Sequence, residues 1–222
     1  YYLNMVANES FLDTAVLRDS VISHAKTLGY TPYSVTAPKA IVNLTVETND
    51  STPATATLAR GYSVAGSLVN SISYRFYVLD TQIVTKSGTK FVFENVEVYE
   101  GKLTSTTYVN NETSNPKAIF TIPDVNIDTS SIKVTVTPAT GNTYTEVYNL
   151  ATDIVDLTGT SKVFFLQETR NGKFQIYFGN DSVGKKLPDG AIVEISYLVT
   201  NGSAGNGTSS FVAEESIGGS SS

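Results

Sequence analysis

Residues 163–178 have the sequence VFFLQETRNGKFQIYF, in which two alternating apolar runs flank the dipeptide Asn171-Gly172. An Asn-Gly pair between such runs is the strongest short-range sign of a β-hairpin with a two-residue type I′ turn. That turn fixes a register in which Gln167 faces Ile176. The predicted inner face holds Val163, Phe165, Phe174, Ile176 and Phe178, and the outer face holds Glu168, Arg170, Lys173 and Gln175. This hairpin predicts an antiparallel β fold.

The rest of the chain after residue 40 supports the same fold class. A period of two, which is typical of half-buried strands, appears in residues 42–46, 72–78, 132–136 and 191–199. Between Phe91 and Tyr99 the apolar positions change phase. One extra residue in a strand reverses which side chains face inward, so a β-bulge near Glu94-Asn95 is expected.

One segment, residues 10–28, has the spacing of an amphipathic helix. Ser10 and Asp13 fit a capping box at its start, Gly29 fits a left-handed residue after its end, and Pro32 prevents continuation. The apolar stripe predicts burial against another chain. The candidate protein-interface residues on it are Phe11, Leu12, Ala15, Ile22, Ala25 and Leu28.

The predicted fold is mainly β (α+β), with an N-terminal amphipathic helix followed by antiparallel β modules. We expect a helical lead-in at 1–39, a first β module at 40–149, a C-terminal β module at 150–207, and a linker or trimmed tail at 208–222. Residues 150–157 fit either a short helix or an irregular connection. Neither end of the chain has the pattern of a natural terminus, which predicts a fragment of a larger chain.

Composition excludes several classes of function. The net charge of −6 and the pI near 4.8 disfavour nucleic acid and anionic membrane surfaces, because both are bound by clustered Lys and Arg. The chain has no cysteine, so it forms no disulfide framework or thiolate metal site. No apolar run approaches the roughly 18 residues that span a bilayer.

No set of residues points to catalysis or to a cofactor. His24 is the only histidine, so neither a zinc site nor a Ser-His-Asp triad is indicated, and a helix-surface histidine is the better interpretation. The stretch Asn180–Gly190 carries two lysines where a calcium loop needs oxygen ligands, which favours simple turns. Nucleotide-binding glycine motifs are missing. Three carboxylate pairs have the spacing of ordinary solvated residues: Glu94/Glu97, Asp153/Asp156 and Glu214/Glu215.

Two stretches resemble a known family. ANESFLDTAVLRDSVISHAKTLGYTPYSVTAPKA, residues 7–40, resembles the segment of baseplate wedge proteins in contractile-tailed bacteriophages where a helix leads into the first strand. FGNDSVGKKLPDGAIVEISYLVTNGSAGNG, residues 178–207, is similar to the glycine-rich signature of the wider J-like baseplate family. Weaker similarities lie in YRFYVLD (74–80) and FENVEVYEG (93–101).

The resemblance implies a structural subunit and not an enzyme. It implies wedge dimers, and a ring around the tail hub that changes shape when the sheath contracts. The implied partners are other wedge subunits and copies of this chain, with no nucleic acid, membrane, cofactor, metal or small-molecule substrate. The implied location is the virion tail baseplate, assembled in the host cytoplasm.

Two alternatives stay open. A carbohydrate-binding β-sandwich or adhesin is compatible with thirteen tyrosines, for which exposed Tyr99 or Tyr108 would supply stacking platforms. A hydrolase requires two of the carboxylates to converge in a cleft.

Overall fold

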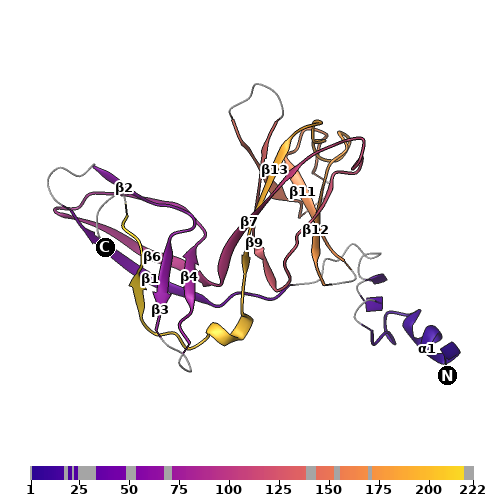
Figure 1. Ribbon diagram of the computed structural model, residues 1–222, viewed down its shortest axis with the longest axis horizontal. Helices are drawn as coiled ribbons and strands as arrows, with labels where there is room; N and C mark the ends of the chain where they lie inside the picture. Colours follow the sequence, from indigo (N-terminus) through magenta and orange to yellow (C-terminus); the bar gives the residue numbers. More distant parts are fainter. Residues whose placement is uncertain are drawn as a thin grey trace. The chain divides into compact units, whose positions relative to one another are not determined.

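The computed structural model describes residues 2–17, 20–21, 23–24, 34–48, 54–67, 72–138, 144–152, 156–169 and 172–217. The protein is mostly β, with antiparallel sheets and one short N-terminal helix (Figure 1). Its elements are α1 (Tyr2–Glu9), β1 (Lys39–Glu47), β2 (Thr55–Leu58), β3 (Ser63–Gly66), β4 (Arg75–Val78), β5 (Gln82–Thr85), β6 (Lys90–Glu100), β7 (Lys102–Val109), β8 (Ile119–Thr121), β9 (Ile127–Thr137), β10 (Glu146–Leu150), β11 (Val163–Glu168), β12 (Phe174–Phe178), β13 (Ile192–Val199), the 3₁₀ helix η1 (Gly202–Gly205) and β14 (Phe211–Ala213). Within the described part of the chain, no helix is long and apolar enough to cross a membrane.

The chain divides into two compact units, each built from separate stretches of sequence. Unit 1 comprises Tyr1–Ser34, Ser105–Val125 and Ile132–Ser196, and unit 2 comprises Val35–Thr104, Asn126–Ser131 and Tyr197–Ser222. The structure thus groups the segments differently from the sequence-based division at residues 39, 149 and 207. Sequence patterns are local, and they do not report that distant stretches join the same unit.

The main sheet of unit 1 has the strand order β7-β13-β9-β10-β11-β12-β8. The pairs β9–β10, β11–β12 and β12–β8 are antiparallel, and the pair β10–β11 is parallel. The two edge strands meet: Tyr108 on β7 donates a hydrogen bond to the carbonyl oxygen of Thr121 on β8, and its ring lies 5.2 Å from that of Phe120. The sheet of unit 1 therefore curls until its edges touch.

Aromatic rings fill the inside of that sheet. Phe178 packs edge-on against Phe120 at 6.0 Å and against Tyr148 at 5.5 Å. Such pairs add about 0.5–1.5 kcal/mol each beyond the area they bury. The other buried apolar residues of this unit include Ile122, Val134, Val136, Phe164, Leu166, Phe174, Ile176, Leu187, Ala191, Val193 and Ile195.

The predicted hairpin exists as β11 and β12, but its register differs by one residue. Leu166, not Gln167, faces Ile176. Thr169 and Lys173 close the loop, which leaves three residues between them, and Gly172 has a φ of +69°. Three-residue loops with a left-handed glycine compete with two-residue turns for the same sequence. The one-residue shift reverses the faces: Glu168 is buried, whereas Phe165 lies on the outer face.

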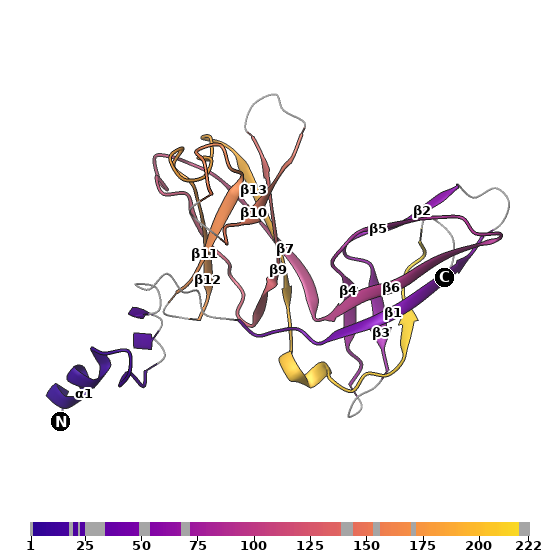
Figure 2. The same ribbon diagram turned by 180° about the vertical axis from the view of Figure 1, so that it is seen from behind.

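Unit 2 consists of a five-stranded sheet, in the order β1-β6-β4-β3-β14, and a two-stranded sheet of β2 and β5 (Figures 1 and 2). Its core contains Val46, Ala56, Leu58, Tyr62, Val64, Phe76, Val78, Phe91, Phe93, Val96, Val98 and Ile217. The bulge predicted near Glu94-Asn95 is confirmed. The β1–β6 register shifts between Val42 and Leu44, and Asn95 has a φ of 54°. As a result all four apolar β6 residues of this core face inward.

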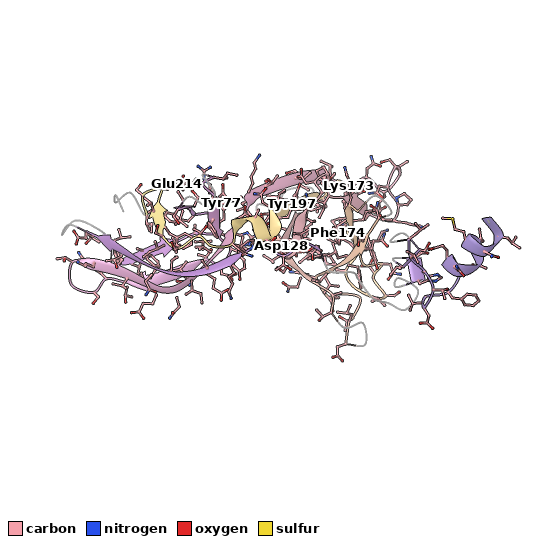
Figure 3. All side chains as sticks on the ribbon, turned by 90° about the horizontal axis from the view of Figure 1, so that it is seen from below. Tyr77, Asp128, Lys173, Phe174, Tyr197 and Glu214 are labelled. Carbon is pink, nitrogen blue, oxygen red and sulfur yellow. The ribbon has the colours of Figure 1, made fainter. Side chains whose placement is uncertain are left out.

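Residues 211–217 are part of the fold of unit 2, in contrast to the linker or tail expected at 208–222. Strand β14 pairs with β3, and Ile217 is only 4% exposed. Glu214, labelled beside β14 in Figure 3, forms an ion pair with Arg75 at 2.7 Å and accepts a hydrogen bond from it at 3.0 Å. Polar serine and glycine neighbours conceal this short strand in the sequence.

The N-terminal helix begins and ends earlier than predicted. Helix α1 covers Tyr2–Glu9, and residues 10–17 form turns and irregular backbone, so the helix expected over 10–28 is wrong in that part. Residues 20–21 and 23–24 are helical again. Residues 18–19, 22 and 25–28 lie outside the described residues. The apolar spacing was compatible with a continuous helix, but it does not fix where a turn interrupts one.

Candidate assembly interface

The N-terminal segment, defined here as residues 2–17, exposes most of its apolar side chains. In a soluble protein, clustered exposed apolar side chains mark a surface that another chain covers. Of the side chains described in this segment, none is buried. The large apolar ones and their exposed fractions are Leu3 85%, Met5 44%, Val6 66%, Phe11 68%, Leu12 45%, Val16 86% and Leu17 48%.

Polar contacts, not apolar packing, hold this segment together. The Glu9 carboxylate accepts hydrogen bonds from the backbone N–H of Val16 (3.0 Å) and of Leu17 (3.3 Å). The pKa of Glu9 is held below its usual value, chiefly by a hydrogen bond from the Ser20 side chain and then by the N–H of Val16. The His24 ring nitrogen Nε2 lies 2.9 Å from the carbonyl oxygen of Glu9. The apolar side chains therefore remain available to a partner.

The candidate interface residues from the sequence fall partly in this segment. Phe11 and Leu12 are exposed, and Ala15 is half-buried. Ile22, Ala25 and Leu28 lie outside the described residues. Sequence reasoning missed Leu3, Met5 and Val6 on α1 because it started the helix at Ser10. The three-residue spacing of Leu3 and Val6 was the available signal.

Unit 1 also has a pocket of about 620 Å³ beside strands β8, β11 and β12. The rings of Phe165 and Tyr177 stack there with their centroids 5.0 Å apart and their planes at 16°. Four amide side chains belong to the wall: Asn110, Asn115, Gln167 and Asn180. Lys186 and Glu112 also line the pocket, and they form an ion pair of 2.7 Å.

The glycine-rich stretch that resembles the baseplate family forms a tightly folded loop after β12. A side chain at Gly179 would overlap the carbonyl group of Gly184. The side-chain oxygen of Asn180 accepts hydrogen bonds from the N–H groups of Ser182 and Val183, both at 3.1 Å. This stretch therefore forms turns, as the sequence predicted.

The two lysines of this loop form ion pairs. Lys185 lies 2.8 Å from the buried carboxylate of Glu146, which Lys162 also contacts at 3.1 Å. The hydrogen bond from Lys185 is the main cause that lowers the pKa of Glu146. Lys186 pairs with Glu112, as above. The lysines thus tie the loop to strand β10 and to the segment after β7.

One carboxylate pair of the sequence meets at a shared hydroxyl group, since the Ser63 side chain lies 3.1 Å from a carboxylate oxygen of Glu214 and 3.3 Å from one of Glu215. Glu97 pairs with Lys39 at 2.6 Å, and Glu214 pairs with Arg75. The Asp153 of the third pair lies outside the described residues. Nowhere in the described ranges do three or more His, Cys, Asp or Glu side chains gather to hold a metal ion.

The tyrosines proposed as stacking platforms are both half-buried. Tyr108 packs on Phe120 and donates its hydroxyl hydrogen to Thr121, as described above. Tyr99 donates a hydrogen bond of 2.6 Å to Glu97. Burial, followed by the Glu97 charge and hydrogen bond, raises the pKa of Tyr99 to about 12. The pair Phe165 and Tyr177, in contrast, lies on the outer face of its sheet.

Comparison with known proteins agrees with the resemblance in the sequence. Residues 105–200 match the family model described as bacteriophage baseplate wedge protein gp6, third domain. The chain is 26% identical over 225 residues to the baseplate wedge protein gp6 of Enterobacteria phage T4, and this match covers 94% of the chain. The chain spans one third (33%) of that relative's length. Both matches show that the chain is similar to bacteriophage baseplate wedge proteins.

Proposed function

We propose that this chain is a structural subunit of a phage tail baseplate. It forms wedge dimers and contributes to a ring around the tail hub, and this ring couples to contraction of the sheath. The relationship to baseplate wedge proteins supports the assignment. One observation carries it: the N-terminal segment exposes its apolar side chains while polar contacts hold its backbone.

The proposed partners are other wedge subunits and copies of the same chain, and the protein works in the virion after assembly in the host cytoplasm. The segment offers Leu3, Val6, Phe11 and Val16 at exposed fractions of 66–86%. Burying one such side chain against a partner is worth about 1.5–3 kcal/mol. The four together would contribute about 6–12 kcal/mol, which is comparable to the cost of association of about 4–15 kcal/mol. We propose no catalytic step and no cofactor.

Co-expression with neighbouring wedge proteins, followed by affinity purification of one of them, tests this function. We expect the chain to co-purify. The double variant Phe11→Ser and Val16→Ser should be lost from the complex, with an unchanged melting temperature. The matched control is Ile83→Ser, which removes an equally exposed apolar side chain (67%) from β5 of unit 2 and should co-purify normally.

Two outcomes contradict the proposal. A chain that stays unbound in the presence of every neighbouring wedge protein is not an assembly subunit. If the Phe11/Val16 variant co-purifies as well as the unchanged chain, the N-terminal segment is not the interface.

Carbohydrate binding is a second candidate function, because the pocket of unit 1 combines a stacked aromatic pair with four amide side chains. Sugar rings stack on aromatic faces, and amides bind their hydroxyl groups. A glycan array tests this function directly: a signal that Tyr177→Ala abolishes supports it, and an array without signal rejects it.

A further inference from the structure

The sheet edges of this protein differ in how well they are protected. At an exposed edge, unpaired N–H and C=O groups invite another strand to add, and proteins usually block them. On β8 the Asn115 side chain takes this role, since its amide accepts from the N–H of Ile119 at 3.1 Å and donates to its carbonyl at 2.9 Å. Tyr108 occupies the carbonyl of Thr121. Strand addition to β8 is therefore blocked by side chains.

Strand β1 is the long edge strand of unit 2, and within the described residues no side chain bonds to its outward backbone groups in this way. It covers nine residues, and among the described strands β6 is its only pairing partner. Figure 2 shows the two strands running side by side. The other edge, β14, has only three residues.

The register shows which backbone groups of β1 point away from β6. The N–H of Glu100 donates to Pro38, and the N–H of Thr48 donates to Thr89, so even-numbered residues bond to β6 at both ends. The extra residue of the bulge lies in β6, between the partners of Val42 and Leu44, so β1 itself stays regular. In an antiparallel pair, successive residues alternate between bonding inward and outward. The outward groups therefore belong to Lys39, Ile41, Asn43, Thr45 and Glu47.

These five residues are complementary to themselves in the antiparallel direction. A two-fold axis at Asn43 places Lys39 of one copy opposite Glu47 of the other. It also places Ile41 opposite Thr45. Opposite charges on facing residues of an antiparallel pair are favourable, and like charges are unfavourable. In a two-fold contact one surface meets the same surface of a second copy, so that surface has to be complementary to itself.

We propose that β1 pairs with β1 of a second copy, antiparallel and centred on Asn43, to join two five-stranded sheets into one. The proposal deepens the self-association part of the proposed function and rests on it for the choice of partner. Each copy contributes N–H and C=O groups of the five outward residues. Because β6 uses the other set of groups, pairing requires no change within unit 2.

Disulfide trapping tests this register, because the chain has no cysteine of its own. Facing residues that exchange both hydrogen bonds have Cα atoms about 5.5 Å apart, within the range that a disulfide spans. Residue 41 of one copy is displaced from residue 41 of the other by four residues, or about 13 Å, along the strand direction, and the same holds for residue 45. We therefore expect a mixture of Ile41→Cys and Thr45→Cys chains to form a disulfide-linked dimer. Each variant alone should remain uncrosslinked and serves as the matched control.

Charge reversal gives an independent result, measured by sedimentation equilibrium of the 23.8 kDa chain. Lys39→Glu places two glutamates opposite each other at both ends of the pair, and we expect it to weaken the dimer by roughly tenfold. Adding Glu47→Lys should restore the dimer. Within one chain the second change adds repulsion from Lys90, which Glu47 contacts at 3.0 Å. Recovery of the dimer therefore cannot come from recovery of the fold.

A mixture that stays uncrosslinked, or single variants that crosslink as well as the mixture, overturns the proposed pairing. A double variant that dimerises no better than Lys39→Glu also overturns it. These measurements use this chain alone, whereas the proposed function is tested with neighbouring wedge proteins. A failure of the β1 pairing can therefore be distinguished from a failure of the proposed function.

Discussion

Substituting Gly179 with alanine tests whether the glycine-rich loop of the family is a packing device. The added methyl group would overlap the backbone of Gly184, which is held by its own hydrogen bonds to Thr158 and Asp181. Gly179 has no positive φ, so the cost is steric and not conformational. Overpacking typically costs 1–3 kcal/mol, and here backbone must move, so we expect about 3 kcal/mol.

The matched control is Gly172→Ala in the neighbouring hairpin. No atom lies within 4 Å of the added methyl group, and the φ of +69° is the only penalty. A left-handed alanine costs about 1 kcal/mol. For a chain of this size, 1 kcal/mol corresponds to about 2–4 °C in melting temperature. Scanning calorimetry should therefore give a loss of about 6–12 °C for Gly179→Ala and about 2–4 °C for Gly172→Ala. An equal or smaller loss for Gly179→Ala would refute the reasoning.

Three further predictions concern stability. Glu146→Gln removes a carboxylate whose pKa is lowered chiefly by the hydrogen bond from Lys185. The ionised carboxylate stabilises the fold above its unfolded pKa near 4.5, and this stabilisation is lost as the pH falls through the folded pKa. Free energies of unfolding from urea titrations should thus differ by about 1–3 kcal/mol at pH 7, and the difference should shrink as the pH falls below 4.5. A difference that does not change with pH argues against the ion pair. The Glu100 carboxylate is 1% exposed and accepts hydrogen bonds of 2.7–3.1 Å from Thr200 and Asn201. Glu100→Gln removes this charge, and the free energy of unfolding should fall by about 1–3 kcal/mol by the same measurement. Ile217→Ala should cost about 2–4 kcal/mol because its side chain is 4% exposed in the core of unit 2; an unchanged melting temperature would make residues 211–217 a tail after all.

Local patterns predicted the features that depend on neighbouring residues. The phase change between Phe91 and Val98 located the bulge, because both the strand period and the extra residue are visible in one short stretch. The hairpin was located for the same reason. Its register was not, since Asn171-Gly172 fits both a two-residue turn and a three-residue loop with a left-handed glycine. The chain selects the longer loop, and Glu168 becomes buried as a result.

Features that depend on distant contacts escaped prediction. Strand β14 exists because Arg75 and the edge of β3 are available to it, and neither lies near it in the sequence. The N-terminal segment illustrates the same limit for the candidate interface. Its apolar residues were recognised at Phe11 and Leu12. The break after Glu9 was not, because the Glu9 carboxylate stabilises the turn through Val16 and Leu17, seven and eight residues away.

Electron microscopy of the parent protein mixed with its wedge partners tests the central claim most directly. Negatively stained samples should contain wedge-shaped particles or rings. The Phe11→Ser and Val16→Ser variant should give fewer of them under identical conditions. Isolated globules that persist with every partner would contradict the assignment of this chain to a baseplate assembly.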